Sequence, residues 1–261
     1  MKSINLKRIL VSFLFFSLIV VGCSNSKSET VEKIELTIAA ASDLTHAFSE
    51  IGKLFENETS TKVTFSFGST GQLADQIENG APFDVFASAN KSFIEQLDKK
   101  NLLLSDTNTL YALGRIGIAT KADSALTIET IDDLLKPEVV KIAIASPDHA
   151  PYGLASKQAL ETAGVWGEIE SKLVFGRNIS DTLTYIETGN AEVAIIALSL
   201  VKEDEVSFTL IDEKMHAPLE QMIAVVERTN HQQQSKEFIE FIRGPIGKPV
   251  MESYGFVVPT E

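Results

Sequence analysis

The chain has 261 residues and a formal net charge of −13 at pH 7. Such an acidic chain does not bind nucleic acid through its overall field, because that field repels phosphate groups. Its single cysteine cannot form a disulfide within the chain.

The first 22 residues have the features of a secretory signal peptide. A basic start precedes an apolar run at 9–21, which is shorter than the ~20 residues of a membrane-spanning helix. The run leads through Gly22 to Cys23, an order that resembles the lipobox at which bacterial lipoproteins are cleaved and acylated. We therefore predict a signal peptide at 1–22 and a lipid anchor on Cys23, on the extracellular face of the cell membrane. An ordinary secretory signal that contains a cysteine is the alternative.

A polar segment at 23–33 has no periodic apolar face and is predicted to be a flexible tether. The leader carries three basic residues and no acidic one, so its removal would leave a charge of −16. This acidity is typical of a soluble domain, and an anionic ligand would have to be attracted locally, against the overall field. The part from Ile34 onward is long enough for one large or two modest domains.

Short apolar strands alternate with amphipathic helices from residue 34 onward. Period-two alternation marks the strands, and apolar residues three to four apart mark the helices. The first series is a strand at 34–38, a helix over 44–55, a strand at 63–67, a helix over 73–77, a strand at 84–87 and a helix over 93–97. This order favours an α/β fold with a parallel sheet and helices on both faces.

A second series of the same kind begins near Ile116. It comprises a strand at 142–145, a helix over 154–163, a short strand at 174–175, a helix over 179–187 and a strand at 193–197. The chain is predicted to end with a strand at 222–226 and helices over 236–242 and near 249–254.

Two α/β units without a Gly/Ser-rich linker predict two lobes joined by extended crossings. We place the crossings near 114–118 and 211–218, so that one lobe is 34–115 plus 218–261 and the other is 116–217. A small ligand would bind in the cleft between the lobes. One continuous doubly wound sheet is the alternative.

Four loops share the order of a strand end, a small or hydroxyl-bearing residue and a helix start. They are 41–43, 68–71, 150–153 and 177–180. The first turn of a helix leaves backbone N–H groups unpaired and carries partial positive charge, so it suits an anion. A single loop of this kind is more often a plain N-cap. Four such loops around one cleft favour an anion site.

Motifs along the whole chain after the tether closely resemble the periplasmic molybdate-binding proteins of ABC importers. They are AAASDL at 39–44, SFGSTGQLA at 66–74, QIENGAPFDVFASA at 76–89, PDHAPYG at 147–153, TGNA at 188–191 and YGF at 254–256. The resemblance implies a two-lobed periplasmic-binding-protein fold, type II-like, with an interdomain ligand cleft. It also implies a monomeric solute-binding lipoprotein, without enzymatic activity or cofactor, that captures molybdate and also tungstate and delivers them to the membrane subunits of an ABC transporter.

The resemblance also implies which residues bind the ligand. Ser42 would give its hydroxyl and amide, and Thr70 its hydroxyl, with the neighbouring Ser69 as an alternative. Tyr152 and Ile179 would each give a backbone amide.

One position departs from the family pattern. Some family members carry a tyrosine on the last strand before the hinge, where this chain has Ala197. Tyr152 could supply the missing phenol from the opposite loop. Arg177, beside the fourth loop, is expected at the rim or in a structural role rather than as a direct anion ligand.

A site made of neutral donors suits this ligand. A fully ionised tetrahedral dianion offers only acceptors, so a pocket of N–H and O–H groups can hold it without lysine or arginine. A protonated oxyanion such as hydrogen phosphate carries an O–H group that would face an N–H or O–H group of the pocket, so it would bind poorly. Molybdate, tungstate and sulfate differ only in size, so a carrier for sulfate or another tetrahedral oxyanion is the alternative.

A rival from another class is an extracellular enzyme that acts on phosphorylated or sulfated substrates. It would need a nucleophile beside a base, or a metal cluster. Asp43 fits a first helical turn and Asp84 a strand, rather than an acid/base pair, and the loop at 68–71 lacks the lysine of a P-loop. No metal site is predicted, because the four histidines stand singly at His46, His149, His216 and His231. A purely structural surface lipoprotein would not need four anion-type loops.

Overall fold

The computed structural model describes residues 34–259. The predicted signal peptide at 1–22, the anchor at Cys23 and the tether at 23–33 lie outside these residues. No helix among the described residues is long and apolar enough to cross a membrane.

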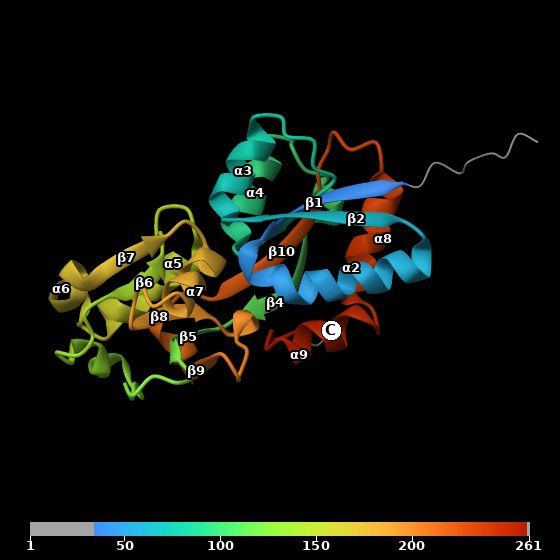
Figure 1. Cartoon of the computed structure of the whole chain (residues 1–261). Helices are drawn as coiled ribbons and strands as arrows, with labels where there is room; N and C mark the ends of the chain where they lie inside the picture. The colour runs from blue at the N-terminus through green and yellow to red at the C-terminus, as the bar shows by residue number, and fades with distance from the viewer. Residues whose placement is uncertain (1–33, 260–261) are drawn as a thin grey trace, which may run out of the picture. The chain divides into compact units, whose positions relative to one another are not determined.

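The first sheet has five strands in the order β2-β1-β3-β10-β4 (Figure 1). They are β1 (Glu35–Ala41), β2 (Lys62–Gly68), β3 (Val85–Ser88), β4 (Thr109–Gly114) and β10 (Leu219–Val225). β1 runs parallel to β2 and β3, as the alternation of strands and helices predicts. β10 is antiparallel to β3 and β4, so the sheet as a whole is mixed, and the parallel arrangement predicted from the first series holds for β1, β2 and β3.

The second sheet repeats this plan in the order β7-β6-β8-β5-β9. Its strands are β5 (Ile116–Lys121), β6 (Ile142–Ala145), β7 (Leu173–Gly176), β8 (Val193–Ala197) and β9 (Val206–Leu210). β6 is parallel to β7 and β8, whereas β5 is antiparallel to β8 and β9. The chain passes from the first sheet to the second between Gly114 and Ile116, and it returns between Leu210 and Leu219.

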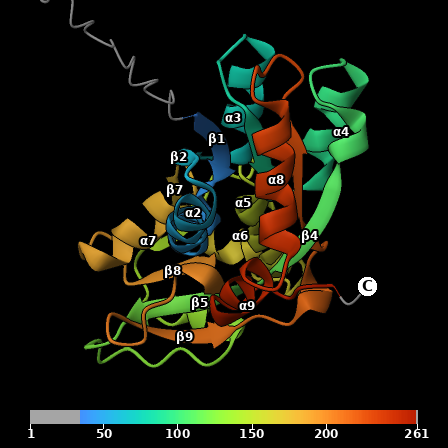
Figure 2. The same cartoon turned by 90° about the vertical axis from the view of Figure 1, so that its right-hand side faces the viewer.

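Helices cover both faces of the first sheet (Figures 1 and 2). The α-helices are α2 (Thr45–Thr59), α3 (Thr70–Glu78), α4 (Lys91–Lys99), α5 (Pro151–Thr162), α6 (Trp166–Ile169), α7 (Ile179–Glu187), α8 (Gln232–Arg243) and α9 (Gly247–Ser253). The 3-10 helices are η1 (Ser42–Leu44), η2 (Ser105–Thr107), η3 (Ile131–Leu135), η4 (Glu170–Lys172), η5 (Leu198–Leu200) and η6 (Glu213–Met215). In the second sheet, α5 and α7 pack against β6 and β8.

Alternation along β1 explains how the first sheet serves two cores. Ile38 and Ala40 point into the cluster that contains α2 and α8, whereas Ala39 points into the cluster formed with α3 and α4. Successive side chains of a strand face opposite sides, so a strand buried on both faces must be apolar at every position. The continuous run of small and branched residues in β1 meets that requirement.

Phenylalanine side chains pack α8 against α2. Phe238 of α8 is fully buried and meets Phe55 edge-on at 5.2 Å between ring centroids. It also meets Phe48 edge-on at 6.0 Å. Edge-to-face geometry adds favourable quadrupole contacts to the burial of apolar area.

Replacing Phe238 by alanine is expected to lower the free energy of unfolding by ~3–5 kcal/mol, because the ring leaves a cavity that its neighbours cannot fill. Urea denaturation of the domain measures this. The matched control is Phe175→Ala on β7, where the side chain is half exposed, with an expected loss of less than about 1 kcal/mol. Equal losses in the two variants would contradict the packing described.

Candidate functional site

The four loops singled out in the sequence meet around one small cavity. Each parallel pair of strands supplies two of them: η1 follows β1 and α3 follows β2, while α5 follows β6 and α7 follows β7. The cavity is small, with about 10 Å³ open to the centre of a water-sized sphere. It is lined by Ala41, Ser42, Asp43, Gly68, Ser69, Thr70, Ala89, Ala150, Pro151, Tyr152, Asn178 and Ile179. All five predicted ligand-binding residues are among them.

The hydroxyl groups of Ser42 and Thr70 are free to donate into this cavity. The Thr70 Oγ1 accepts a hydrogen bond from the backbone N–H of Ala89 at 3.2 Å. The Ser42 Oγ accepts from the N–H of Ser180 at 3.4 Å. Within residues 34–259 neither hydroxyl donates to a protein acceptor, so the hydrogen of each is available to an anion.

Ser69 is placed differently from its neighbour Thr70. Its hydroxyl donates to the carbonyl oxygen of His149 at 2.5 Å and lies 2.9 Å from the ring Nδ1 of the same histidine. A hydroxyl has one hydrogen, and here the carbonyl takes it. The geometry therefore favours Thr70 over Ser69 as the donor to a ligand.

Two backbone N–H groups complete the donor set. Tyr152 lies in the first turn of α5, directly after Pro151, and Ile179 is the first residue of α7. The N–H groups of a first helical turn have no acceptor within their own helix. In the described part of the chain, neither the Tyr152 nor the Ile179 amide has an acceptor outside its own helix. Both amides are therefore open to a ligand in the cavity.

Among residues 34–259, no lysine, arginine or histidine lines the cavity. The Arg177 side chain, which lies before α7, is mostly exposed and pairs at 2.7 Å with Asp181 in the first turn of that helix. Arg177 is therefore not among the lining residues, in keeping with a rim or structural role. No group of three or more His, Cys, Asp or Glu side chains that could hold a metal ion exists in the described structure.

A family model described as bacterial extracellular solute-binding protein matches residues 36–257. The chain belongs to this family. The molybdate-binding protein ModA of Rhodobacter capsulatus is 31% identical over 85% of this chain and 88% of its own length. YvgL of Bacillus subtilis, a candidate ABC transporter substrate-binding lipoprotein, is 30% identical over 95% of this chain and 96% of its own length.

Solved structures give the same result. The periplasmic molybdate-binding protein of Azotobacter vinelandii superposes with a TM-score of 0.81 and 25% identity, over 86% of this chain and all of that one. The two-lobed α/β fold of a periplasmic binding protein is thereby shown, and the resemblance to molybdate-binding proteins noted in the sequence is confirmed.

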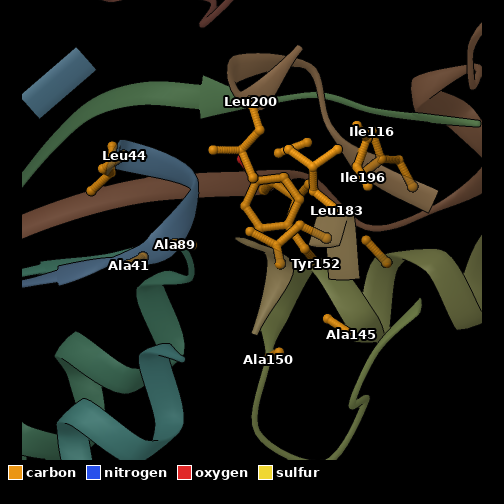
Figure 3. Packing of buried hydrophobic residues seen from close by; sticks show 14 of the residues in the cluster. Ala41, Leu44, Ala89, Ile116, Ala145, Ala150, Tyr152, Leu183, Ile196 and Leu200 are labelled. Carbon is orange, nitrogen blue, oxygen red and sulfur yellow. The ribbon is translucent and has the colours of Figure 1, made fainter. Parts of the chain in front are cut away.

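This solute-binding protein also has a buried polar cluster behind the cavity. The Tyr152 hydroxyl and the Gln221 Nε2 each donate to the Oδ2 of Asp43 at 2.9 Å, and Gln221 also donates to the Tyr152 oxygen at 3.1 Å. In Figure 3 the Tyr152 ring lies among apolar side chains that include Leu183 and Leu200. The phenol hydrogen of Tyr152 is thus donated to Asp43. It is not available to a ligand in place of the family tyrosine that is Ala197 in this chain.

Sequence reasoning missed this cluster. Asp43 was expected only as a first-turn helix residue, and Gln221 was left outside the predicted strand, which began at Met222. One signal was present: Gln221 is in phase with Leu219 and Ile223 on the buried face of β10. A polar residue at an inward position of a strand needs a buried partner.

Burial controls the protonation of Asp43. Loss of water around this carboxyl raises its pKa from 3.8 to about 7, and hydrogen bonds from Tyr152 and Gln221 only partly oppose that rise. The phenol pKa of Tyr152 is raised well above 10, by its burial and by the nearby Asp43. The phenol pKa of Tyr111 is raised for the same two reasons.

Further hydrogen bonds join the two sheet-bearing halves around the cavity. Ser180 Oγ donates to the carbonyl oxygen of Ser42 at 3.0 Å, and Gly71 N–H donates to that of His149 at 2.9 Å. A Cβ atom on Gly71 would lie 2.8 Å from the His149 oxygen, so only glycine allows this approach. The structure is therefore that of a cleft with its walls in contact.

Asp43→Asn is expected to change how stability depends on pH. An acid whose folded pKa is raised contributes full stability below its unfolded value, here 3.8, and loses it as pH rises through about 7. The stability of wild type relative to Asp43→Asn should therefore fall by a few kcal/mol between pH 4 and 8. Urea denaturation of both proteins at several pH values measures the difference. The exposed Asp148→Asn controls for the loss of one charge, and a pH-independent gap for Asp43→Asn would contradict the prediction.

Proposed function

We propose that this protein captures molybdate, and also tungstate, and delivers it to the membrane subunits of an ABC transporter. The observation that carries the proposal is the cavity itself: hydroxyl and amide hydrogens converge on it, and no cationic side chain lines it. A fully ionised tetrahedral oxyanion supplies the acceptors that such a donor set lacks. The names of the relatives support the choice of molybdate.

The energetics of neutral donors are sufficient for capture. A hydrogen bond to a charged group contributes roughly 1.5–3 kcal/mol net. The hydroxyls of Ser42 and Thr70 and the amides of Tyr152 and Ile179 together offer roughly 6–12 kcal/mol, against the ~8 kcal/mol of micromolar binding and the costs of ordering. These donors are dipoles fixed by the fold, so they act locally even though the protein as a whole is acidic. The oxyanion is cargo, not a cofactor.

The proposal also includes closure of the two lobes and attachment of the protein to the membrane. The two lobes, 34–115 plus 218–261 and 116–217, would move about the crossings between the sheets and close over the ligand as a monomer. The lipidated Cys23 would hold the protein on the extracellular face of the membrane, beside its transporter. The matching Bacillus subtilis relative carries the name of a lipoprotein, which supports the anchor.

Ser42→Ala and Thr70→Ala should each weaken molybdate binding by a factor of ten or more, because each removes a donor that has no other acceptor. Calorimetric titration of the domain from Ser24 onward measures the affinity. Thr64→Ala on the exposed edge of β2 is the matched control and should bind like wild type. Unchanged affinity in both cavity variants would refute the assignment.

Titration with tungstate, sulfate and phosphate in parallel decides among the alternatives. Tight binding of sulfate instead would retain the mechanism and change the cargo. The rival proposal, an enzyme acting on phosphorylated or sulfated substrates, needs a nucleophile beside a base. Ser69 lies beside the His149 ring, but its hydroxyl donates to the His149 carbonyl oxygen rather than to the ring nitrogen, so it is not activated as a nucleophile. Silence with all four anions would refute an oxyanion carrier.

Cys23→Ser is expected to abolish incorporation of a radiolabelled fatty acid into the protein, because the thiol that would carry the lipid is gone. Labelling of cells that express either form, followed by immunoprecipitation, measures the modification. Equal labelling of the two forms would contradict a lipid anchor at this residue.

A further inference from the structure

The buried cluster behind the cavity joins residues that come from both halves of the molecule. Asp43 in η1 and Gln221 in β10 belong to the half built on the first sheet. Tyr152 in α5 and Ser199 in η5 belong to the half built on the second. Ser199 Oγ donates to the Asp43 carbonyl oxygen at 2.7 Å, so both the side chain and the backbone of Asp43 are bound across the cleft. None of these four side chains is more than 4% exposed.

These bonds depend on the two halves being close together. Of the two side chains that donate to the Asp43 carboxyl in the described structure, Tyr152 comes from the opposite half and Gln221 from the same half as Asp43. If the halves separated, its hydroxyl would leave both Asp43 and Gln221. An interaction present in one state and absent in the other shifts the equilibrium between those states. The cluster therefore favours the closed arrangement.

The cluster is also directly connected to the proposed anion site. Asp43 follows Ser42, whose hydroxyl faces the cavity, and both residues belong to the short helix η1. Tyr152 contributes its backbone N–H to the cavity while its side chain reaches back to Asp43. Tyr152 thus has its amide at the cavity and its phenol in the cluster. A hydrogen bond that fixes the phenol also fixes the position of the amide.

The position of the phenol argues against a direct contact with the ligand. A Cβ atom built on Gly114 would lie 2.1 Å from the Tyr152 hydroxyl oxygen. Gly114 ends β4, where the chain crosses to the second sheet, so the hydroxyl points toward this crossing. Its hydrogen is donated to Asp43, and its oxygen accepts from Gln221.

We propose that Asp43 and Gln221 are positioning residues that capture the Tyr152 phenol when the lobes close, hold the first turn of α5 over the bound oxyanion and so slow its release. This inference rests on the proposed function, because it concerns the same cavity. It differs from a role of Tyr152 as a direct phenol ligand, since the phenol acts through Asp43 rather than on the anion.

Tyr152→Phe tests the inference because it retains the ring and the backbone N–H and removes only the hydroxyl. The full domain is loaded with radiolabelled molybdate and chased with an excess of unlabelled molybdate. Release of label from Tyr152→Phe is expected to be at least ten-fold faster than from wild type, with an association rate within a factor of two. Tyr111→Phe is the matched control, because this buried tyrosine lies beside the cluster and its hydroxyl has no hydrogen-bond partner in the described structure. It should release at the wild-type rate.

Variants at Asp43 distinguish a phenol that acts through Asp43 from a phenol that contacts the anion directly. Asp43→Asn retains an oxygen that can accept from the phenol, so it should release within a factor of three of wild type. Asp43→Leu removes the acceptor at similar volume and should release as fast as Tyr152→Phe. Adding Tyr152→Phe to Asp43→Leu should then cause no further acceleration, because the two changes remove the same bond.

Each outcome is decisive. Release of label from Tyr152→Phe at the wild-type rate would overturn the proposal. Additive acceleration in the double variant would overturn it as well, because the phenol would then act on the ligand independently of Asp43. If Asp43→Leu does not fold, Asp43→Ala, which also removes the acceptor, takes its place in the single and double variants. Failure of wild type to retain molybdate at all would refute the proposed function instead.

Discussion

In the described part of the chain, backbone N–H groups at the starts of α5 and α7 and the hydroxyls of Ser42 and Thr70 have no acceptor, and these four residues line one cavity. The rest of the structure positions them there. Adjacent parallel strands bring their carboxyl ends to the same edge of a sheet, so the helices that follow them start side by side. β1 and β2 do this in one half, and β6 and β7 in the other. With the two edges facing each other, four helix starts surround a volume of small-ion size.

This design explains how an acidic protein can hold an anion without a cationic side chain. Fixed dipoles act over short distances and are not reduced by the net charge of a surface that water and salt screen. A set of donors penalises any ligand that brings a hydrogen of its own, because that hydrogen meets no acceptor. The proposed selectivity for a fully ionised oxyanion therefore follows from what the cavity lacks as much as from what it contains.

Closure and binding are linked because the same short segments do both. Ser42 faces the cavity with its side chain and accepts a bond from Ser180 across the cleft at its carbonyl oxygen. Thr70 faces the cavity, and its neighbours Ser69 and Gly71 bond to His149 on the opposite wall. Polar bonds shielded from water by the protein are stronger than the same bonds in bulk water, so they favour one closed geometry over a range.

The sequence by itself determined the alternation of strands and helices, the four loops of anion-binding type and the resemblance to molybdate-binding proteins. These signals are local: periodicity, a small residue before a helix start, and motifs of a few residues. The division of roles between Ser69 and Thr70 was beyond it, because the two hydroxyls are adjacent and only the position of His149, 80 residues away in the chain, distinguishes them. The Asp43 cluster was beyond it for the same reason, since its partners stand 109 and 178 residues further along the chain. Tertiary structure alone brings such groups together, and burial then decides their hydrogen bonds and the protonation of Asp43.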